Sequence, residues 1–103
     1  MAKLGLSFRP YHPGELLKEE LECRHLQQKS FAHKFGISYT ALNEILNGKR
    51  PVSTDFALMM EATLGVSADL LVRMQTTYNM QVARNDKKLI KRFNEMRKIA
   101  SIL

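Results

Sequence analysis

Side chains that donate and accept hydrogen bonds recur at helical spacing between residues 38 and 47. At about 100° per residue, Thr40, Asn43, Glu44 and Asn47 fall on one side of a helix. The opposite side, a sector of about 100°, holds apolar residues only: Leu42, Ile45 and Leu46. A helix that serves only as scaffold more often displays Lys, Glu and Ala. Amide and hydroxyl groups can bond base edges when a helix lies in a major groove, so this pattern favours a helix that packs with one face and reads with the other.

Cations flank this helix on both sides in the sequence. Lys29 precedes it, and Lys49 with Arg50 follows it, where positive charge can replace counterions at a nucleic-acid backbone. Tyr39 falls on the boundary between the two helix faces. Gln28 can reach a phosphate or support the helix through a hydrogen bond. The predicted contact residues are Gln28, Lys29, Ser38, Tyr39, Thr40, Asn43, Asn47, Lys49 and Arg50.

The elements around these residues read as short helices and tight turns. Pro13 suits a first helical position, and Glu15 complements the positive end of a helix dipole, so a helix is predicted over residues 13–24. A second runs from about residue 26 to Phe35 and ends at Gly36. A third, capped by Ser38, ends at Asn47 and Gly48. Helices are also predicted over residues 53–64, 67–84 and 86–103, which makes the chain all-α.

Periodicity also predicts the core of this bundle. The residues expected to face inward are Leu16, Leu17, Leu21, Cys23, Phe31, Ala32, Phe35, Leu42, Ile45, Leu46, Phe56, Ala57, Leu58, Met60, Leu64, Leu70, Leu71, Met74, Tyr78 and Val82. A chain of 103 residues with 45% hydrophobic and 25% charged residues is the size and composition of one folded domain. We predict a five-helix domain over residues 1–84 and a basic C-terminal helix or tail over residues 85–103.

The net charge of +6 lies mainly in that tail. Residues 84–103 hold seven basic and two acidic residues, which leaves +1 for the preceding 83. The total charge is therefore a weak argument for nucleic-acid binding, and the arrangement from Gln28 to Arg50 is the stronger one. In the tail, Leu89, Phe93, Met96, Ala100 and Leu103 recur at coiled-coil spacing over barely two heptads. Two interpretations stay open: a helix on its own domain or frayed in isolation, and a docking helix for a second subunit or another protein.

Catalysis and cofactor binding are not predicted. Ser30, Ser38 and Cys23 have no base arranged beside them, and no Gly-rich phosphate loop is present. The three histidines lie on separate segments without cysteines or acidic pairs at ligand spacing, so no metal is expected. No apolar run approaches a membrane span, and residues 1–14 lack the apolar core of a secretion signal. A cytoplasmic protein that is not an enzyme is expected.

Two motifs carry a resemblance to a known family. The frame formed by Gln28, Ala32, Gly36-Ile37-Ser38 and Asn47-Gly48-Lys49 resembles the helix-turn-helix of the lambda-repressor/Cro (XRE) proteins. The opening from Arg9 to Leu17, RPYHPGELL, is similar to the RP-x-HPGE start of the HigA (VapI-like) antitoxins. Residues 74–79, MQTTYN, resemble their LQ-x-x-YD ending, with Asn79 in place of the usual Asp. The likeness covers residues 9–84.

The resemblance implies a lambda-repressor-like fold and a DNA-binding antitoxin. By resemblance, bases are read by Tyr39, Thr40 and Asn43, and phosphates are held by Gln28, Asn47 and Lys49. It also implies a homodimer on an inverted-repeat operator, repression of its own operon, and neutralisation of a RelE-like ribonuclease toxin. Two alternatives remain at this point: a free-standing XRE-type repressor without a toxin, and a helical adaptor protein that binds through its tail.

Overall fold

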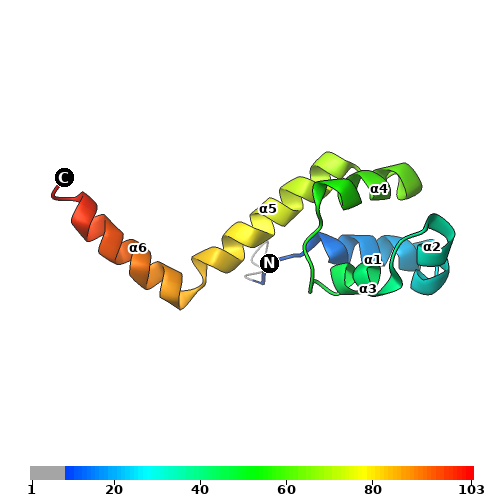
Figure 1. Ribbon diagram of the computed structural model, residues 1–103, viewed down its shortest axis with the longest axis horizontal. Helices are drawn as coiled ribbons and strands as arrows, with labels where there is room; N and C mark the ends of the chain where they lie inside the picture. Colours follow the sequence, from blue (N-terminus) through cyan, green and yellow to red (C-terminus); the bar gives the residue numbers. More distant parts are fainter. Residues whose placement is uncertain (1–8) are drawn as a thin grey trace, which may run out of the picture. The chain divides into compact units, whose positions relative to one another are not determined.

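The computed structural model describes residues 9–103 and contains only helices over that range, as predicted (Figure 1). The six helices are α1 (Pro13–Cys23), α2 (Gln28–Phe35), α3 (Tyr39–Leu46), α4 (Thr54–Leu64), α5 (Ala68–Arg84) and α6 (Lys87–Ala100). The five-helix fold with an additional C-terminal helix is therefore confirmed. Residues 1–8, which include most of the segment predicted not to be a secretion signal, lie outside the described residues.

Local chemistry starts most of these helices. The hydroxyl oxygens of Ser38, Ser53 and Ser67 each accept a backbone N–H three residues later, at 3.1–3.2 Å. The Asp86 carboxylate accepts the N–H groups of Lys88 and Leu89 at 2.9 and 3.2 Å. Each cap satisfies backbone donors that a helix start would otherwise leave without a partner.

Left-handed glycines end α2 and α4. Gly36 has φ 67° and Gly65 has φ 73°, a conformation that other residues rarely adopt. After Gly36 the N–H of Ile37 donates to the carbonyl oxygen of Ala32 at 2.8 Å. The chain thus reverses sharply between α2 and α3, and α3 packs against both α1 and α2.

The core lies among the first five helices and largely follows the predicted periodicity. The buried apolar side chains are Leu17, Leu21, Phe31, Ala32, Leu42, Ile45, Leu46, Val52, Phe56, Ala57, Met60, Leu64, Ala68 and Leu71. Val52 and Ala68 were not among the predicted core residues. Both adjoin helix ends, where periodicity is a poor guide because no full turn of helix precedes them.

The prediction of burial is wrong for five residues, which are exposed: Cys23, Phe35, Leu58, Leu70 and Val82. Leu58 and Leu70 lie on the outer sides of α4 and α5, about 100° or more from every buried residue of their helix. Phe35 ends α2, and its ring packs on that of Phe31 with centroids 4.9 Å apart. Cys23 is the last residue of α1, beyond the buried Leu21.

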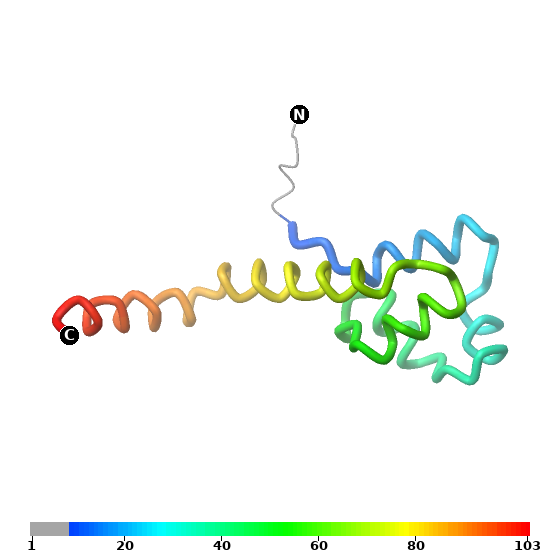
Figure 2. Tube along the Cα trace, turned by 90° about the horizontal axis from the view of Figure 1, so that it is seen from above, coloured from blue at the N-terminus to red at the C-terminus, as the bar shows by residue number. Residues whose placement is uncertain are grey.

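The chain divides into two compact units. The first is Tyr11–Thr76, and the second contains Thr77–Leu103 together with Arg9 and Pro10 of the described residues. Helix α5 contributes residues to both units. Figure 2 follows α6 from orange to red after the short break at Asn85 and Asp86. The predicted domain boundary after Arg84 remains a prediction.

Candidate nucleic-acid interface

Helix α3 has one buried face and one polar face, as its sequence predicts. Leu42, Ile45 and Leu46 are at most 4% exposed. Thr40 and Asn47 are exposed on the outer side, and Asn43 is half-buried between them. The buried face fixes how the helix is rotated, so the hydroxyl and amide groups project from the outer face in a defined order.

The amides of α2 and α3 are hydrogen-bonded to each other. Asn43 Nδ2 donates to Gln28 Oε1 at 3.0 Å, across the turn between the two helices. Of the two roles considered for Gln28, this contact supports the second, in which it holds α3. The bond leaves Asn43 Oδ1 and Gln28 Nε2 to bind a further partner, so two neighbouring helices present one fixed pair of amides.

Asn47 is held against its own helix and against α1. Its Nδ2 donates to the carbonyl oxygen of Asn43 at 2.9 Å, and its Oδ1 accepts a hydrogen bond from Lys18 Nζ at 3.3 Å. The amide therefore caps the C-terminal end of α3, and it brings Lys18 beside that end. Lys18 was not predicted as part of this surface, because it lies 29 residues earlier in the chain.

The predicted cations differ in their surroundings. Lys29 Nζ lies 5.7 Å from the centroid of the Tyr39 ring, a cation–π geometry that contributes about 0.5–1 kcal/mol at exposed sites. Lys49 makes no side-chain hydrogen bond or ion pair within residues 9–103. Arg50 forms an ion pair with Glu44, whose Oε1 accepts hydrogen bonds from Arg50 Nε at 3.0 Å and Nη2 at 2.6 Å.

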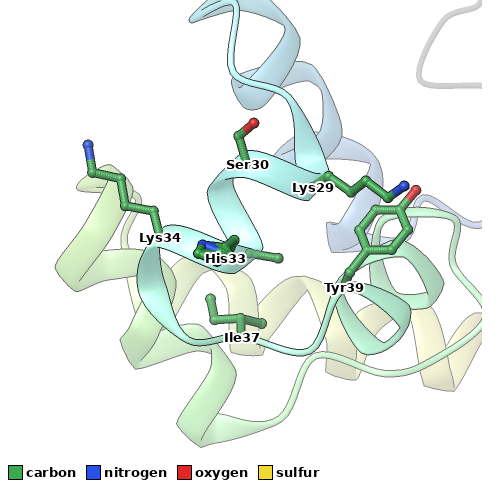
Figure 3. Close-up of a pocket in the computed structure, with 7 residues that line it drawn as sticks. Lys29, Ser30, His33, Lys34, Ile37 and Tyr39 are labelled. Atoms are coloured by element: carbon green, nitrogen blue, oxygen red, sulfur yellow. The ribbon is translucent and has the colours of Figure 1, made fainter.

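An open hollow of about 690 Å³ adjoins the start of α3. Figure 3 shows Lys29 and Tyr39 pointing toward one another at its edge, whereas Lys34 points away. The hollow is lined by Lys29, Ser30, Ala32, His33, Lys34, Ile37 and Tyr39. The polar side chains among them lie on α2 and at the start of α3, and in helix-turn-helix proteins the helix before the recognition helix crosses the nucleic-acid backbone.

Comparison with known proteins identifies the family. The helix-turn-helix family model matches residues 17–71, which include α2, the turn and α3. Virulence-associated protein I of Dichelobacter nodosus is 35% identical over 80 residues, which make up 77% of this chain and 74% of that protein. This chain belongs to the XRE-type helix-turn-helix proteins, in the HigA (VapI-like) family.

Solved structures of the HigA family share this fold. The HigA-family addiction module antidote protein of Coxiella burnetii is 30% identical, with a TM-score of 0.69, over 87% of this chain and 94% of that one. Antitoxin HigA of Pseudomonas aeruginosa, solved with the higBA promoter, is 29% identical, with a TM-score of 0.68. That match covers 73% of this chain and 83% of the Pseudomonas chain.

The HPGE motif of this HigA-family chain joins the start of α1 to the end of α3. His12 Nδ1 accepts the N–H of Gly14 at 2.8 Å, and the Glu15 carboxylate accepts the N–H of His12 at 3.3 Å. The His12 ring also hydrogen-bonds the backbone of Arg50. A Cβ on Gly14 would lie 1.8 Å from the Ile45 carbonyl oxygen, so only glycine permits this approach. The sequence predicts the helix start but not this contact with α3.

His12 is neutral in this setting. The side chain is 3% exposed, and burial lowers the pKa of His12 below 6.5, although Glu15 and the Arg50 backbone oppose that shift. Because Nδ1 accepts a hydrogen bond, the ring proton lies on Nε2 and is available to the Arg50 carbonyl. The neutral ring therefore uses both nitrogens to hold α1 and the segment after α3 together.

Helix α5 also holds this segment. Gln75, which is 7% exposed, accepts the N–H of Val52 at 2.8 Å through Oε1. Gln75 belongs to the stretch that resembles the LQ-x-x-YD ending of the family. The chain leaving α3 is thus fixed by His12 at Arg50 and by Gln75 at Val52.

The described residues contain neither a candidate metal site nor a candidate membrane-spanning helix. Within residues 9–103 no three His, Cys, Asp or Glu side chains gather where they could hold a metal ion. None of the helices in this range has the length and apolar character needed to cross a membrane.

Proposed function

We propose that this protein is the antitoxin of a HigBA-type toxin–antitoxin pair. In this proposal it acts in the cytoplasm as a homodimer, binds an inverted repeat in the promoter of its own operon, and represses it. It also neutralises a RelE-like ribonuclease toxin. The proposal rests mainly on the polar face of α3, where the Asn43 amide is held by Gln28 at 3.0 Å. The Pseudomonas aeruginosa relative solved with the higBA promoter supports the same function.

The predicted residues take two roles in this proposal. Tyr39, Thr40 and Asn43 contact base edges in the major groove. The remaining residues contact the sugar–phosphate backbone or set the start of α3: Gln28, Lys29, Ser38, Asn47, Lys49 and Arg50. Gln28 bonds Asn43 through Oε1 and can still donate to a phosphate through Nε2, so its two roles are compatible.

A dimer follows from the size of the reading surface. A helix of eight residues reads only a few base pairs, which is too little to select one site in a genome. Two copies related by a twofold axis read two half-sites about 34 Å apart, one turn of B-DNA. An inverted repeat is the DNA symmetry that matches such a dimer.

DNA binding is tested with the full-length protein and the DNA immediately upstream of its gene. We expect a discrete complex in a gel-shift assay at moderate salt, resistant to excess random duplex and containing two chains per duplex. The helical-adaptor alternative predicts no sequence-dependent shift. Binding that random duplex removes completely would contradict the proposal.

The toxin half of the proposal has its own test. We expect the tagged protein to co-purify with the product of the neighbouring gene when the two are co-expressed, and to relieve growth inhibition caused by that product. A free-standing repressor would bind its promoter but show neither effect. Sequence-specific DNA binding without these effects would favour that alternative.

A further inference from the structure

Glu44 stands out on the polar face of α3 because it is negatively charged. Between His25 and Arg50 it is the only acidic residue, among four Lys and Arg residues. On a helical wheel it lies about 40° from Thr40 and about 60° from Asn47, in the middle of the outer face. A carboxylate in that position is repelled by phosphates and by bases that present only acceptors, so it limits which DNA the helix can approach.

Arg50 fixes the direction of this carboxylate. Two guanidinium nitrogens converge on one oxygen, with Nε 3.0 Å and Nη2 2.6 Å from Glu44 Oε1. The other oxygen, Oε2, accepts no hydrogen bond within residues 9–103. The pair is partly exposed, with 38% of the Glu44 side chain and 51% of the Arg50 side chain accessible. Arg50 thus holds the carboxylate in place and leaves one of its acceptor atoms open.

Two bases present an amino donor in the major groove, cytosine through N4 and adenine through N6, but adenine also presents the N7 acceptor beside its donor. Guanine presents the N7 and O6 acceptors and thymine presents the O4 acceptor, so a lone carboxylate oxygen suits cytosine best. We propose that Glu44, positioned by Arg50, accepts a hydrogen bond from the N4 amino group of a cytosine in each half-site and discriminates against guanine and thymine there. This inference rests on the proposed DNA-binding function and adds one base preference to it.

The ion pair between Glu44 and Arg50 also limits which groups Arg50 can bind. While Glu44 holds Nε and Nη2, these donors cannot both bind a phosphate of an unrelated sequence. Removal of the carboxylate frees one cation on the DNA-facing surface and removes one repulsive charge. The Glu44 carboxylate therefore accounts both for the preference for cytosine and for weak binding to random DNA.

The test is selection of binding sites from a randomised duplex library by the full-length protein. Glu44→Ala and Glu44→Gln are compared with wild type and with Glu19→Gln, which removes an exposed acid of α1 and leaves the side chains of α3 unchanged. We expect wild type and Glu19→Gln to select C·G at one position of each half-site. Glu44→Ala should lose that preference only, whereas Glu44→Gln should turn it toward adenine, the base that a Gln amide pairs with.

Titration of labelled duplexes then measures the effect. Replacing the selected C·G pair by T·A should weaken wild-type binding about 5- to 150-fold, the range of one base-specific contact. Glu44→Ala should bind both duplexes equally and bind random DNA more tightly than wild type does. Arg50→Ala should reduce the discrimination, because the carboxylate is no longer held.

Two failures of this experiment have different meanings. If Glu44→Ala and Glu44→Gln select the wild-type site unchanged, the inference is wrong and DNA binding stands. If wild type selects no sequence at all, the proposed function itself is wrong. Circular dichroism establishes that each variant is folded. If Glu44→Ala does not fold, Glu44→Gln, which keeps the shape of the side chain, provides the test.

Discussion

Among the described glycines, Gly14 leaves the least room for a side chain. Alanine in place of glycine within a helix usually stabilises a protein by about 0.5–1 kcal/mol. At Gly14 the added Cβ would meet the Ile45 carbonyl oxygen at 1.8 Å, and a backbone oxygen cannot rotate away. We predict that Gly14→Ala instead lowers the free energy of unfolding by about 1–3 kcal/mol in urea denaturation. A gain in stability would contradict the close approach of α1 to α3.

His12 makes the stability depend on pH. Its pKa is lowered by burial, so protonation favours the unfolded chain, where the pKa is near 6.5. Stability is therefore complete above pH 6.5 and falls as the pH drops through 6.5 toward the lower pKa of the folded state. The slope for this one proton is at most about 1.4 kcal/mol per pH unit.

The measurement is urea denaturation between pH 7.5 and 5.5, above the range in which most carboxylates titrate. Asparagine keeps a cap acceptor but does not titrate, so we expect His12→Asn to flatten the dependence on pH. His33→Asn, a change at an exposed histidine of α2, should leave the dependence as in wild type. An unchanged slope in His12→Asn would show that another group is responsible.

Most of the candidate contact residues can be predicted from the sequence, but the residues that they hydrogen-bond to cannot. The polar face of α3 follows from helical periodicity alone. The link from Lys18 to Asn47 spans 29 residues and that from Val52 to Gln75 spans 23, so neither has a local signature. Glu44 was not among the predicted contact residues, although it is the only acidic residue between His25 and Arg50.

At the scale of elements, the segment between α3 and α4 depends on α5. The Gln75 amide oxygen is the acceptor for the Val52 N–H, and both residues are buried. Gln75→Ala should lower the free energy of unfolding by about 1–3 kcal/mol, because it leaves a buried donor without its acceptor. Gln81→Ala, at an exposed position of the same helix, should change it by less than about 0.5 kcal/mol. Equal effects in thermal or urea unfolding would contradict this role.

The boundaries of the elements were largely predictable because they are set by local chemistry. Capping serines, Asp86 and the glycines at 36 and 65 mark helix ends through contacts within a few residues. The start of α2 was placed about two residues early, at Leu26, since no side chain caps it. The prediction that Leu58 and Leu70 are buried is wrong because it followed from their apolar residue type. Their positions on the outer sides of the helices predict exposure instead.

Over the whole molecule, most of the net charge and the polar face of α3 lie in separate parts of the sequence. Residues 84–103 carry +5, whereas the polar face of α3 has amides, hydroxyls and a paired acid. None of the α6 residues is buried, and its apolar side chains Phe93, Met96 and Ile99 are at least 41% exposed.

Salt dependence separates the two charged regions. Replacing Lys49 by Ala should weaken binding to every duplex and reduce the slope of log K against log salt by about one, since a single phosphate contact is lost. The same change at Lys98 on α6 is the matched control. If both changes reduce the affinity for DNA equally, α6 contacts DNA as well as the segment that follows α3.

In the proposed function, the outer face of α3 reads DNA sequence. The most direct measurement is a titration of the full-length protein on its own upstream duplex and on a random duplex of equal length, for wild type and for Thr40→Ala/Asn43→Ala. We predict that the double change costs about 1–3 kcal/mol per base-specific contact on the upstream duplex and leaves binding to the random duplex nearly unchanged. Equal losses on the two duplexes, or no loss on either, would contradict the claim.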